Sequence, residues 1–203
     1  FTGRIRSADW NTLVNDPYTP MLNRAIQAQF APGSTFKPII AVAGLESGDL
    51  TDHETLVCPG GASWYGRFFK CHSKHGLVDL HRGIVQSCDT FFYHAGNAIG
   101  IDKIAEYGSM AGFGKKTGID LPGEAEGIMP STRWKLRHFR ERWQPGDTIN
   151  VAIGQGYVTV TPIQLAVAIG GMATGGAWFQ PHLVQAATRP QPVRRAEWKP
   201  ENI

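Results

Sequence analysis

Charged residues are scarce in this chain of 203 residues, and long apolar runs are missing from it. Asp, Glu, Lys and Arg make up 18% of the residues, against roughly 25% in an average soluble domain, which argues against a coiled coil and against a charge-rich disordered segment. The formal net charge of +3 is too small to indicate nucleic-acid binding. No apolar run approaches the roughly 18 residues that cross a membrane. The start of the chain has no secretory signal, so we expect any targeting segment to have been removed or to lie outside this sequence.

Glycine and proline are abundant instead, with 24 and 13 residues. Both residues favour turns, because glycine adopts positive φ angles and proline fixes its own φ angle. The length is that of about one domain. The composition therefore predicts one compact domain with many tight turns and long ordered loops.

The apolar pattern predicts mainly helices. Residues 34–45 are apolar on almost every side, which predicts a buried central helix ending at Ser47-Gly48. Other helices are predicted from periodicity and capping residues over 22–29, 79–86, 90–98, 102–110 with Asp102 as N-cap, 131–142 with Ser131 as N-cap, and 161–173. Apart from the short helix at 22–29, residues 1–31 are expected to be irregular, and residues 49–78 are expected to form loops. Residues 149–160 alternate loosely between apolar and polar positions, and a short strand is expected at 178–184.

The helix predicted over 131–142 carries a run of basic residues, which are Arg133, Lys135, Arg137, Arg140 and Arg142. Such a run can bind an anionic ligand. A solvated basic helix face is the more common reason for it, and this interpretation is preferred.

Ser34-Thr35-Phe36-Lys37 is a Ser-x-x-Lys sequence at the start of the central helix. Residues three apart share a helix face, so the Lys37 amine is expected within reach of the Ser34 hydroxyl. A serine needs a neighbouring base to become a nucleophile, and a lysine in apolar surroundings can serve in its neutral form. Pro32-Gly33 places Ser34 at a helix N-terminus, where backbone amides can stabilise an oxyanion. The motif alone also fits a capping serine and a surface lysine.

Longer segments carry a more specific signal, and they are Asn15–Pro20, Leu22–Ala25, Ala31–Pro38, Ser87–Tyr93, Thr117–Glu124, Gly146–Ile149 and Ile153–Ala166. In this order they closely resemble the penicillin-binding transpeptidases of class B, and within that class the penicillin-binding protein 2 group of cell-elongation enzymes. The resemblance implies that Ser34 is the acylated nucleophile and that Lys37 is its base. Ser87 would be the serine of the second motif, which relays a proton towards the leaving amine. Asp89 takes the third place of that motif, where many relatives have Asn; it would orient the substrate amide and add a charge.

The family also needs a Lys-Ser/Thr-Gly sequence on a strand along the other side of the cleft. Lys116-Thr117-Gly118 matches it in letters, but it precedes the Gly154-Gln155-Gly156 segment, whereas the catalytic sequence follows that segment in the family. We therefore predict that Lys116 is not catalytic and that the true sequence lies beyond Ile203. The chain is expected to be the front part of a transpeptidase domain, catalytically incomplete, without the last sheet strands, the C-terminal helix, the membrane anchor and the pedestal domain.

The three cysteines cannot all pair with one another. Cys58, Cys71, His75 and Cys88 have the ligand types of a tetrahedral zinc site, whereas a Cys58–Cys71 disulfide with a free Cys88 fits the spacing equally well. The resemblance favours zinc, because penicillin-binding protein 2 relatives are expected to carry a zinc site built from this loop and the second-motif helix. His72 is the nearest competitor of His75, which is preferred because Gly76 follows it and because its family position matches. Zinc is then expected to order residues 58–88 and position Ser87 and Asp89.

The resemblance implies an α/β (α+β) fold of the penicillin-binding transpeptidase and serine β-lactamase type. Residues 1–203 would form the N-terminal and central, mainly helical part of this domain, truncated before its final sheet strands, with 49–89 as a zinc-binding loop and second-motif segment. The implied function is a peptidoglycan D,D-transpeptidase that cross-links stem peptides through a serine acyl-enzyme and is acylated by β-lactams. A D,D-carboxypeptidase or β-lactamase of the same fold, and a non-catalytic fragment that binds β-lactams, are the alternatives. A class A β-lactamase would need a deacylating glutamate, for which Glu124 and Glu126 are the candidates.

The implied partners are stem peptides ending in D-Ala-D-Ala, β-lactam antibiotics and the membrane glycan polymerase of the elongation complex, and no nucleic acid is expected. The implied location is the bacterial periplasm, with an N-terminal helix outside this sequence as the anchor in the inner membrane.

Overall fold

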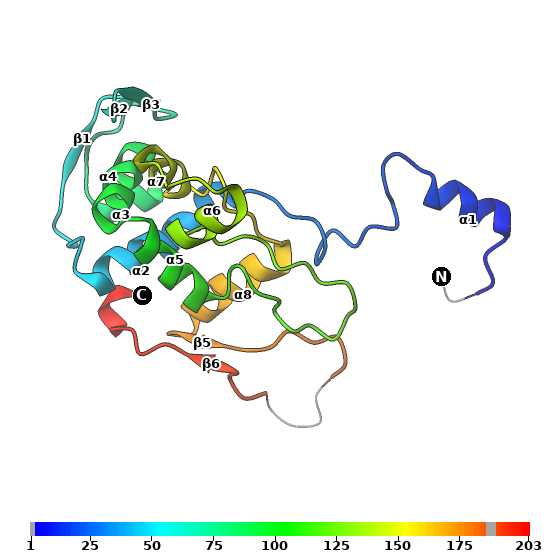
Figure 1. Cartoon of the computed structure of the whole chain (residues 1–203). Helices are drawn as coiled ribbons and strands as arrows, with labels where there is room; N and C mark the ends of the chain where they lie inside the picture. Colours follow the sequence, from blue (N-terminus) through cyan, green and yellow to red (C-terminus); the bar gives the residue numbers. More distant parts are fainter. Residues whose placement is uncertain (1–2, 186–189) are drawn as a thin grey trace.

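The computed structural model describes residues 3–185 and 190–203, which form a group of helices with short two-stranded ribbons at its edges (Figure 1). The α-helices are α1 (Ser7–Val14), α2 (Lys37–Ser47), α3 (Leu80–Val85), α4 (Asp89–Ile99), α5 (Ile101–Ala111), α6 (Thr132–Phe139), α7 (Pro145–Val151) and α8 (Pro162–Ala173). Two short 3-10 helices are η1 (Gly33–Phe36) and η2 (Pro200–Asn202). The strands are β1 (Leu56–Cys58), β2 (Gly61–Trp64), β3 (Arg67–Lys70), β4 (Gly76–Val78), β5 (Ala177–Trp178) and β6 (Arg194–Arg195).

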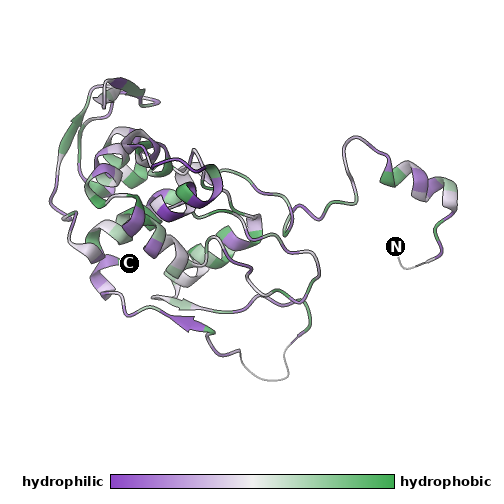
Figure 2. Cartoon of the chain, in the orientation of Figure 1, coloured by the Kyte–Doolittle hydropathy of each residue, from purple (hydrophilic) through white to green (hydrophobic). Residues whose placement is uncertain are grey.

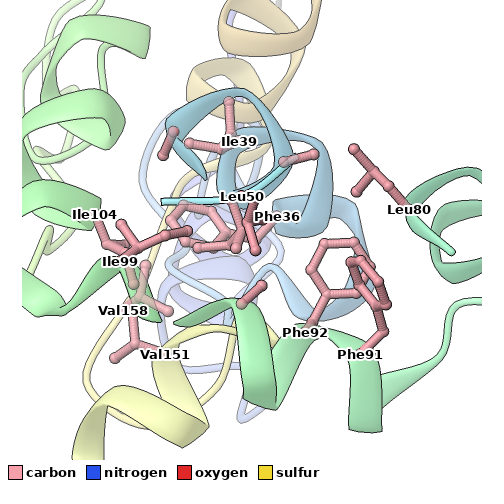
Figure 3. Packing of buried hydrophobic residues seen from close by; sticks show 14 of the residues in the cluster. Phe36, Ile39, Leu50, Leu80, Phe91, Phe92, Ile99, Ile104, Val151 and Val158 are labelled. Carbon is pink, nitrogen blue, oxygen red and sulfur yellow. The ribbon is translucent and has the colours of Figure 1, made fainter. Parts of the chain in front are cut away.

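The prediction of a buried central helix is confirmed. The 3-10 turn η1 leads into α2, every residue of α2 from Ile39 to Gly44 is buried, and α2 packs against α4 and α5. Figure 3 shows Phe36 and Ile39 of this segment among apolar side chains from several other elements, including Leu50, Phe92 and Ile99. The helix ends at Gly48, whose φ angle of 74° is the left-handed conformation expected of a glycine stop. The first residues of α2 are therefore held in the centre of the fold.

The caps predicted at Ser131 and Thr161 are confirmed, and Asp79, predicted as the first residue of its helix, is also a cap. The side chains of Asp79, Ser131 and Thr161 accept hydrogen bonds from the backbone of the first turns of α3, α6 and α8. The N-cap assignment of Asp102 is wrong, because α5 begins after Gly100 at Ile101. Asp102 instead accepts hydrogen bonds from the backbone and hydroxyl of Thr132 and so fixes the start of α6. The helix α6 stops at Phe139, earlier than predicted, because Arg140 turns left-handed with a φ angle of 60°.

Residues 49–78 are not simply a loop. They form two antiparallel ribbons, in which β1 pairs with β4 and β2 pairs with β3. The turn between β2 and β3 is a two-residue hairpin turn with positive φ angles at Tyr65 and Gly66. It was not predicted because tyrosine is an unusual residue at such a position. A third ribbon pairs β5 with β6, and Figure 2 shows the two arginines of β6 as hydrophilic. The strand predicted over 178–184 is therefore limited to the two residues of β5.

Other differences from the sequence prediction lie near the two site segments. Residues 22–29 form turns, not a helix, since the Asn23 side chain accepts from Ala25 N. The helix α7 was missed inside a segment that looked irregular, although Pro145 and a capping box between Gln144 and Asp147 start it. The helix α1 was also missed; it has no buried residue and stands apart from the other helices in Figure 1. Among the described residues, no helix is both long enough and apolar enough to cross a membrane.

Candidate functional site

Ser34 lies in η1, at the edge of a hollow of about 440 Å³. The hollow is lined by residues from four separate segments, which are Gly33, Ser34, His72, Ser87, Asp89, Ile153 and Gln155. Ser34 sits one turn before the buried start of α2, so its hydroxyl is at the surface of the hollow while the following residues are held in the core. The structure thus places an exposed serine on a rigid support.

Lys37 is 2% exposed and makes three short contacts with the second predicted motif. Its Nζ donates to the backbone oxygen of Ser87 at 2.7 Å, to Ser87 Oγ at 2.9 Å and to Asp89 Oδ1 at 2.7 Å. These three acceptors match the three N–H donors of an ammonium group. The buried lysine is therefore fully paired, which a buried charge requires.

Ser87 connects Lys37 to Ser34. Its hydroxyl donates to Ser34 Oγ at 2.7 Å and accepts from Lys37 Nζ. No hydrogen bond joins Lys37 to Ser34 directly among the described residues, so the expected direct contact is replaced by a chain through Ser87. Ser87 also has a φ angle of 52°, an unusual conformation for a residue with a side chain that costs of order 1 kcal/mol. This conformation precedes α4, where Asp89 is the first residue.

The Gly154-Gln155-Gly156 segment lies against the nucleophile. Gly33 N donates to Gly154 O at 2.9 Å, and Phe30 and Val160 exchange backbone hydrogen bonds beside them. A Cβ atom on Gly154 would lie only 2.2 Å from Gly33 O and 2.7 Å from Gly33 N. The segment therefore determines where the backbone before Ser34 runs. The sequence showed the glycines, but their contact with Gly33 could not be found from spacing.

Replacing Gly154 by alanine is expected to displace Ser34. The φ angle of 69° and the clash with the Gly33 backbone both oppose a side chain there. We expect a loss of at least about 3 kcal/mol in the free energy of unfolding. For the acylation of Ser34 by a labelled penicillin that the sequence resemblance implies, we expect a loss of about 100-fold in rate. Urea unfolding and stopped-flow labelling measure the two quantities.

Gly48→Ala is the matched control for this substitution. Gly48 has a φ angle of 74° and open space around a Cβ atom, so its replacement carries the backbone strain without the clash. It is expected to cost about 1 kcal/mol and leave the labelling rate unchanged. Equal effects of the two variants on labelling would show that the contact between Gly154 and Gly33 does not position the serine.

Lys116-Thr117-Gly118 does not line the hollow. The backbone of Thr117 and Gly118 donates to the buried carboxylate of Glu124, which closes the loop between them. Glu124 is therefore used within its own loop and does not line the hollow. The backbone of Glu126 is held in the same loop, because its carbonyl oxygen accepts a hydrogen bond from the buried side chain of Gln164. Neither of the two glutamates considered as deacylating bases lines the hollow.

Cys58, Cys71, His75 and Cys88 come together below the hollow. One ligand atom of each lies within 4.8 Å of all the others, and the sulfurs of Cys58 and Cys71 are each 3.5 Å from His75 Nδ1. All three cysteines are buried and free, so the Cys58–Cys71 disulfide is absent from the structure. In a tetrahedral zinc site a sulfur and a nitrogen ligand are about 3.6 Å apart, given bond lengths of about 2.3 and 2.1 Å. The geometry of the four side chains fits such an ion.

The environment of the thiols also suits a cation. Burial opposes ionisation of Cys58, but hydrogen bonds from the Thr90 hydroxyl and from the backbone of His75 and Gly60 outweigh it and lower its pKa to about 6. Burial raises the pKa of Cys88 to about 12. A bound cation would remove the proton from such a thiol, because the charge of the ion dominates the local field.

His72 is the competing ligand that the sequence left in view. Cys71, His72 and Asp89 also have ligand atoms within 4.8 Å of one another. This second group has only three members, its histidine is exposed, and Asp89 is already paired with Lys37. The group with Cys58, His75 and Cys88 offers the four ligands of a closed structural zinc site.

Arg133 and Arg137 of α6, and Arg140 and Arg142 just after it, are exposed, as expected of a solvated basic face. Lys135 differs from the prediction, because it is buried at 3% exposure and donates to Asp147 Oδ2 at 2.6 Å. That hydrogen bond raises the pKa of Lys135, and the amine also lies over the Tyr157 ring. Lys135 therefore anchors α6 to α7 and does not belong to the basic surface.

The chain is similar to known proteins over nearly its whole length. The family model described as the penicillin binding protein transpeptidase domain matches residues 2–203. Peptidoglycan D,D-transpeptidase MrdA of Acinetobacter baumannii is 41% identical over 204 residues, which cover 97% of this chain and 30% of that protein. The chain thus spans about a third of the length of the curated relatives it matches.

Solved structures agree with this match. The crystal structure of Pseudomonas aeruginosa PBP2 in complex with WCK 5153 has a TM-score of 0.90 and 36% identity, covering 98% of this chain and 47% of that one. A structure titled for the coordination of polymerization and crosslinking by a peptidoglycan synthase complex has a TM-score of 0.86 and 32% identity, covering 98% of this chain and 36% of that one. Both likenesses extend over nearly all of the chain.

Proposed function

Because the chain belongs to the penicillin-binding protein transpeptidase family, we propose that it carries the acylation centre of a peptidoglycan D,D-transpeptidase. The resemblance to the penicillin-binding protein 2 group and the α/β (α+β) fold expected from it are confirmed by the family match and the solved structures. The observation that supports the function most directly is the hydrogen-bonded chain from Ser34 through Ser87 to Lys37 at the edge of an open hollow.

Ser34 is the proposed nucleophile, and its proton leaves through Ser87. When Lys37 is neutral, its two N–H groups can still donate to the Ser87 backbone and to Asp89, and its lone pair then accepts from Ser87 Oγ. Both hydroxyls reorient so that Ser34 donates to Ser87 and Ser87 donates to Lys37. Each proton then has an acceptor within hydrogen-bond distance, which general base catalysis requires.

The proposed substrate is a stem peptide ending in D-Ala-D-Ala. Ser34 Oγ forms an ester bond with the carbonyl carbon of the penultimate D-Ala, the amide bond to the last residue breaks, and the proton held by Lys37 returns through Ser87 to the leaving amine. An amine of a second stem then attacks the ester, forms the new amide and restores the Ser34 hydroxyl. A β-lactam ring would acylate the same oxygen, because its strained amide takes the place of the scissile bond.

Cys58, Cys71, His75 and Cys88 are proposed to hold a structural zinc ion. The ion would supply no step of the reaction. Cys88 lies between Ser87 and Asp89 in sequence, so closing the cluster would fix the backbone that presents both residues to Lys37.

The proposed partners and location follow from the relatives. A membrane glycan polymerase is the proposed protein partner, since one similar structure is titled for a complex that couples polymerization and crosslinking. The proposed location is the bacterial periplasm at the inner membrane, where peptidoglycan stems and the polymerase meet.

Hydrolysis on the same fold is the second candidate function. A carboxypeptidase or β-lactamase would use water in place of the second stem. The side chains of Glu124 and Glu126 do not line the hollow, which favours transpeptidation over a class A β-lactamase mechanism.

Labelling with a fluorescent penicillin tests the acylation centre. The full-length protein is expected to form a covalent adduct that mass spectrometry of its peptides assigns to Ser34, and Ser34→Ala is expected to form none. Ser47→Ala is the control, because Ser47 is a serine at the far end of α2. An adduct on another residue, or equal labelling of Ser34→Ala, would refute the proposal.

A further inference from the structure

His72 lines the hollow but takes no part in the proton path or in the preferred ligand set. It follows Cys71 directly, and its side chain is 55% exposed beside Ser34 and Asp89. Its ring packs edge-on against that of His75, with the ring centres 4.8 Å apart. The ring is therefore held at the hollow by a member of the cysteine cluster.

Asp89 has one oxygen without a strong partner. Lys37 donates to Oδ1 at 2.7 Å, whereas Oδ2 faces His72 Nδ1 at 3.6 Å. A carboxylate can only accept, so Oδ2 needs a donor. The separation is too long for a hydrogen bond as it stands, but hydrogen bonds at catalytic centres commonly shorten when the substrate binds.

Building on the proposed function, we propose that His72 is a positioning residue that donates from Nδ1 to Asp89 Oδ2 during acylation. The contact would keep Asp89 from turning its second oxygen towards Lys37. This matters because Asp89 and Ser87 share the same amine, and a carboxylate that bound Lys37 through both oxygens would draw it away from Ser87. A neutral imidazole is sufficient for this role, with the proton on Nδ1 and an acceptor at Nε2.

Three replacements of His72 separate the two ring nitrogens. Asparagine places an amide nitrogen near the position of Nδ1, glutamine places one near that of Nε2, and alanine removes both. The exposed His81 on α3 does not line the hollow, so His81→Ala is the matched control. Stopped-flow labelling of the full-length protein over a range of fluorescent penicillin concentrations gives the dissociation constant K and the acylation rate constant k2 separately. Zinc content and urea unfolding are measured on the same samples.

In His72→Ala, k2 is expected to fall about tenfold while K changes less than twofold. The lost hydrogen bond to the Asp89 carboxylate affects how Lys37 and Ser87 are placed for the acylation step, and it does not affect how the penicillin first binds. His72→Asn is expected to recover k2 to within about threefold of the unaltered protein, and His72→Gln is not. Zinc content and unfolding are expected to stay unchanged in all three variants.

Several results would overturn the proposal. These are an unchanged k2 in His72→Ala, rescue by glutamine as good as rescue by asparagine, a change confined to K, or a loss of zinc that would make His72 a ligand. Failure of the unaltered protein to label at Ser34 would refute the proposed function itself. Normal labelling of that protein together with an unchanged His72→Ala variant would refute only the role of His72.

Discussion

Replacing Lys37 by methionine is expected to abolish acylation of Ser34 and to lower the free energy of unfolding by about 3 kcal/mol. The variant removes the proposed base and leaves Asp89, whose side chain is 17% exposed, without its buried cation. Breaking a buried ion pair by removing one partner typically costs about 3–5 kcal/mol, and the partial exposure of Asp89 puts this case at the lower end. Penicillin labelling and urea unfolding measure the two effects.

Two further variants separate catalysis from stability. Adding Asp89→Asn to Lys37→Met removes the orphaned charge, so most of the stability is expected to return while labelling stays absent. Lys135→Met is the matched control, because Lys135 is an equally buried lysine paired with Asp147 at 2.6 Å and lies outside the hollow. It is expected to cost a similar free energy and to keep its labelling rate. If it lost labelling as fully as Lys37→Met does, the effect at Lys37 would be one of stability alone.

Removing zinc is expected to have the second largest effect. Protein purified without chelator is expected to contain about one zinc ion per chain by elemental analysis. Stripping the ion should lower the free energy of unfolding by at least about 3 kcal/mol, the value for a ligand held at a hundred times its dissociation constant or more. Penicillin labelling should slow as well, because Cys88 adjoins both Ser87 and Asp89. Returning zinc, and not magnesium, should restore both properties.

Single replacements locate the ion. Cys58→Ala and Cys88→Ala are expected to lose zinc, whereas His53→Ala, at an exposed histidine outside the cluster of four ligands, should retain it. The opposite result is well defined: a protein that contains no zinc and has a single free thiol would carry the disulfide between Cys58 and Cys71.

The parts of the fold that the sequence predicted well depend on neighbouring residues. The central helix has a Ser-x-x-Lys start, an apolar pattern and a glycine stop, all within residues 34–48. Asp79, Ser131 and Thr161 cap helices through hydrogen bonds within one turn. Such signals are local, and they were therefore visible before the structure.

The missed features depend on residues distant in sequence. Lys37 sits beside Ser87 because α2 packs on α4, and no spacing rule shows that the proton path runs through Ser87 and not directly to Ser34. Asp102 shows the same limit, since it accepts hydrogen bonds from the start of α6, 30 residues later, and does not cap α5. Ile153 and Gln155 reach the hollow only because Gly154 meets the backbone of Gly33. The residues of the candidate site could be identified from the sequence, whereas the hydrogen bonds and contacts between them could be identified only from the folded structure.

The pairing of Phe30 with Val160 has a consequence for the order of folding. Beside it, Thr159 Oγ1 donates to Gln29, a partner 130 residues earlier in the chain. A contact of such long sequence separation closes a large loop and forms late. During synthesis Ser34 leaves the ribosome before the segment after α7, so the backbone that supports it is complete only when that segment has also emerged and docked. Reactivity of the serine would then report the end of folding, and a nascent chain stalled before residue 150 would be unreactive even with Ser34, Lys37 and Ser87 all present.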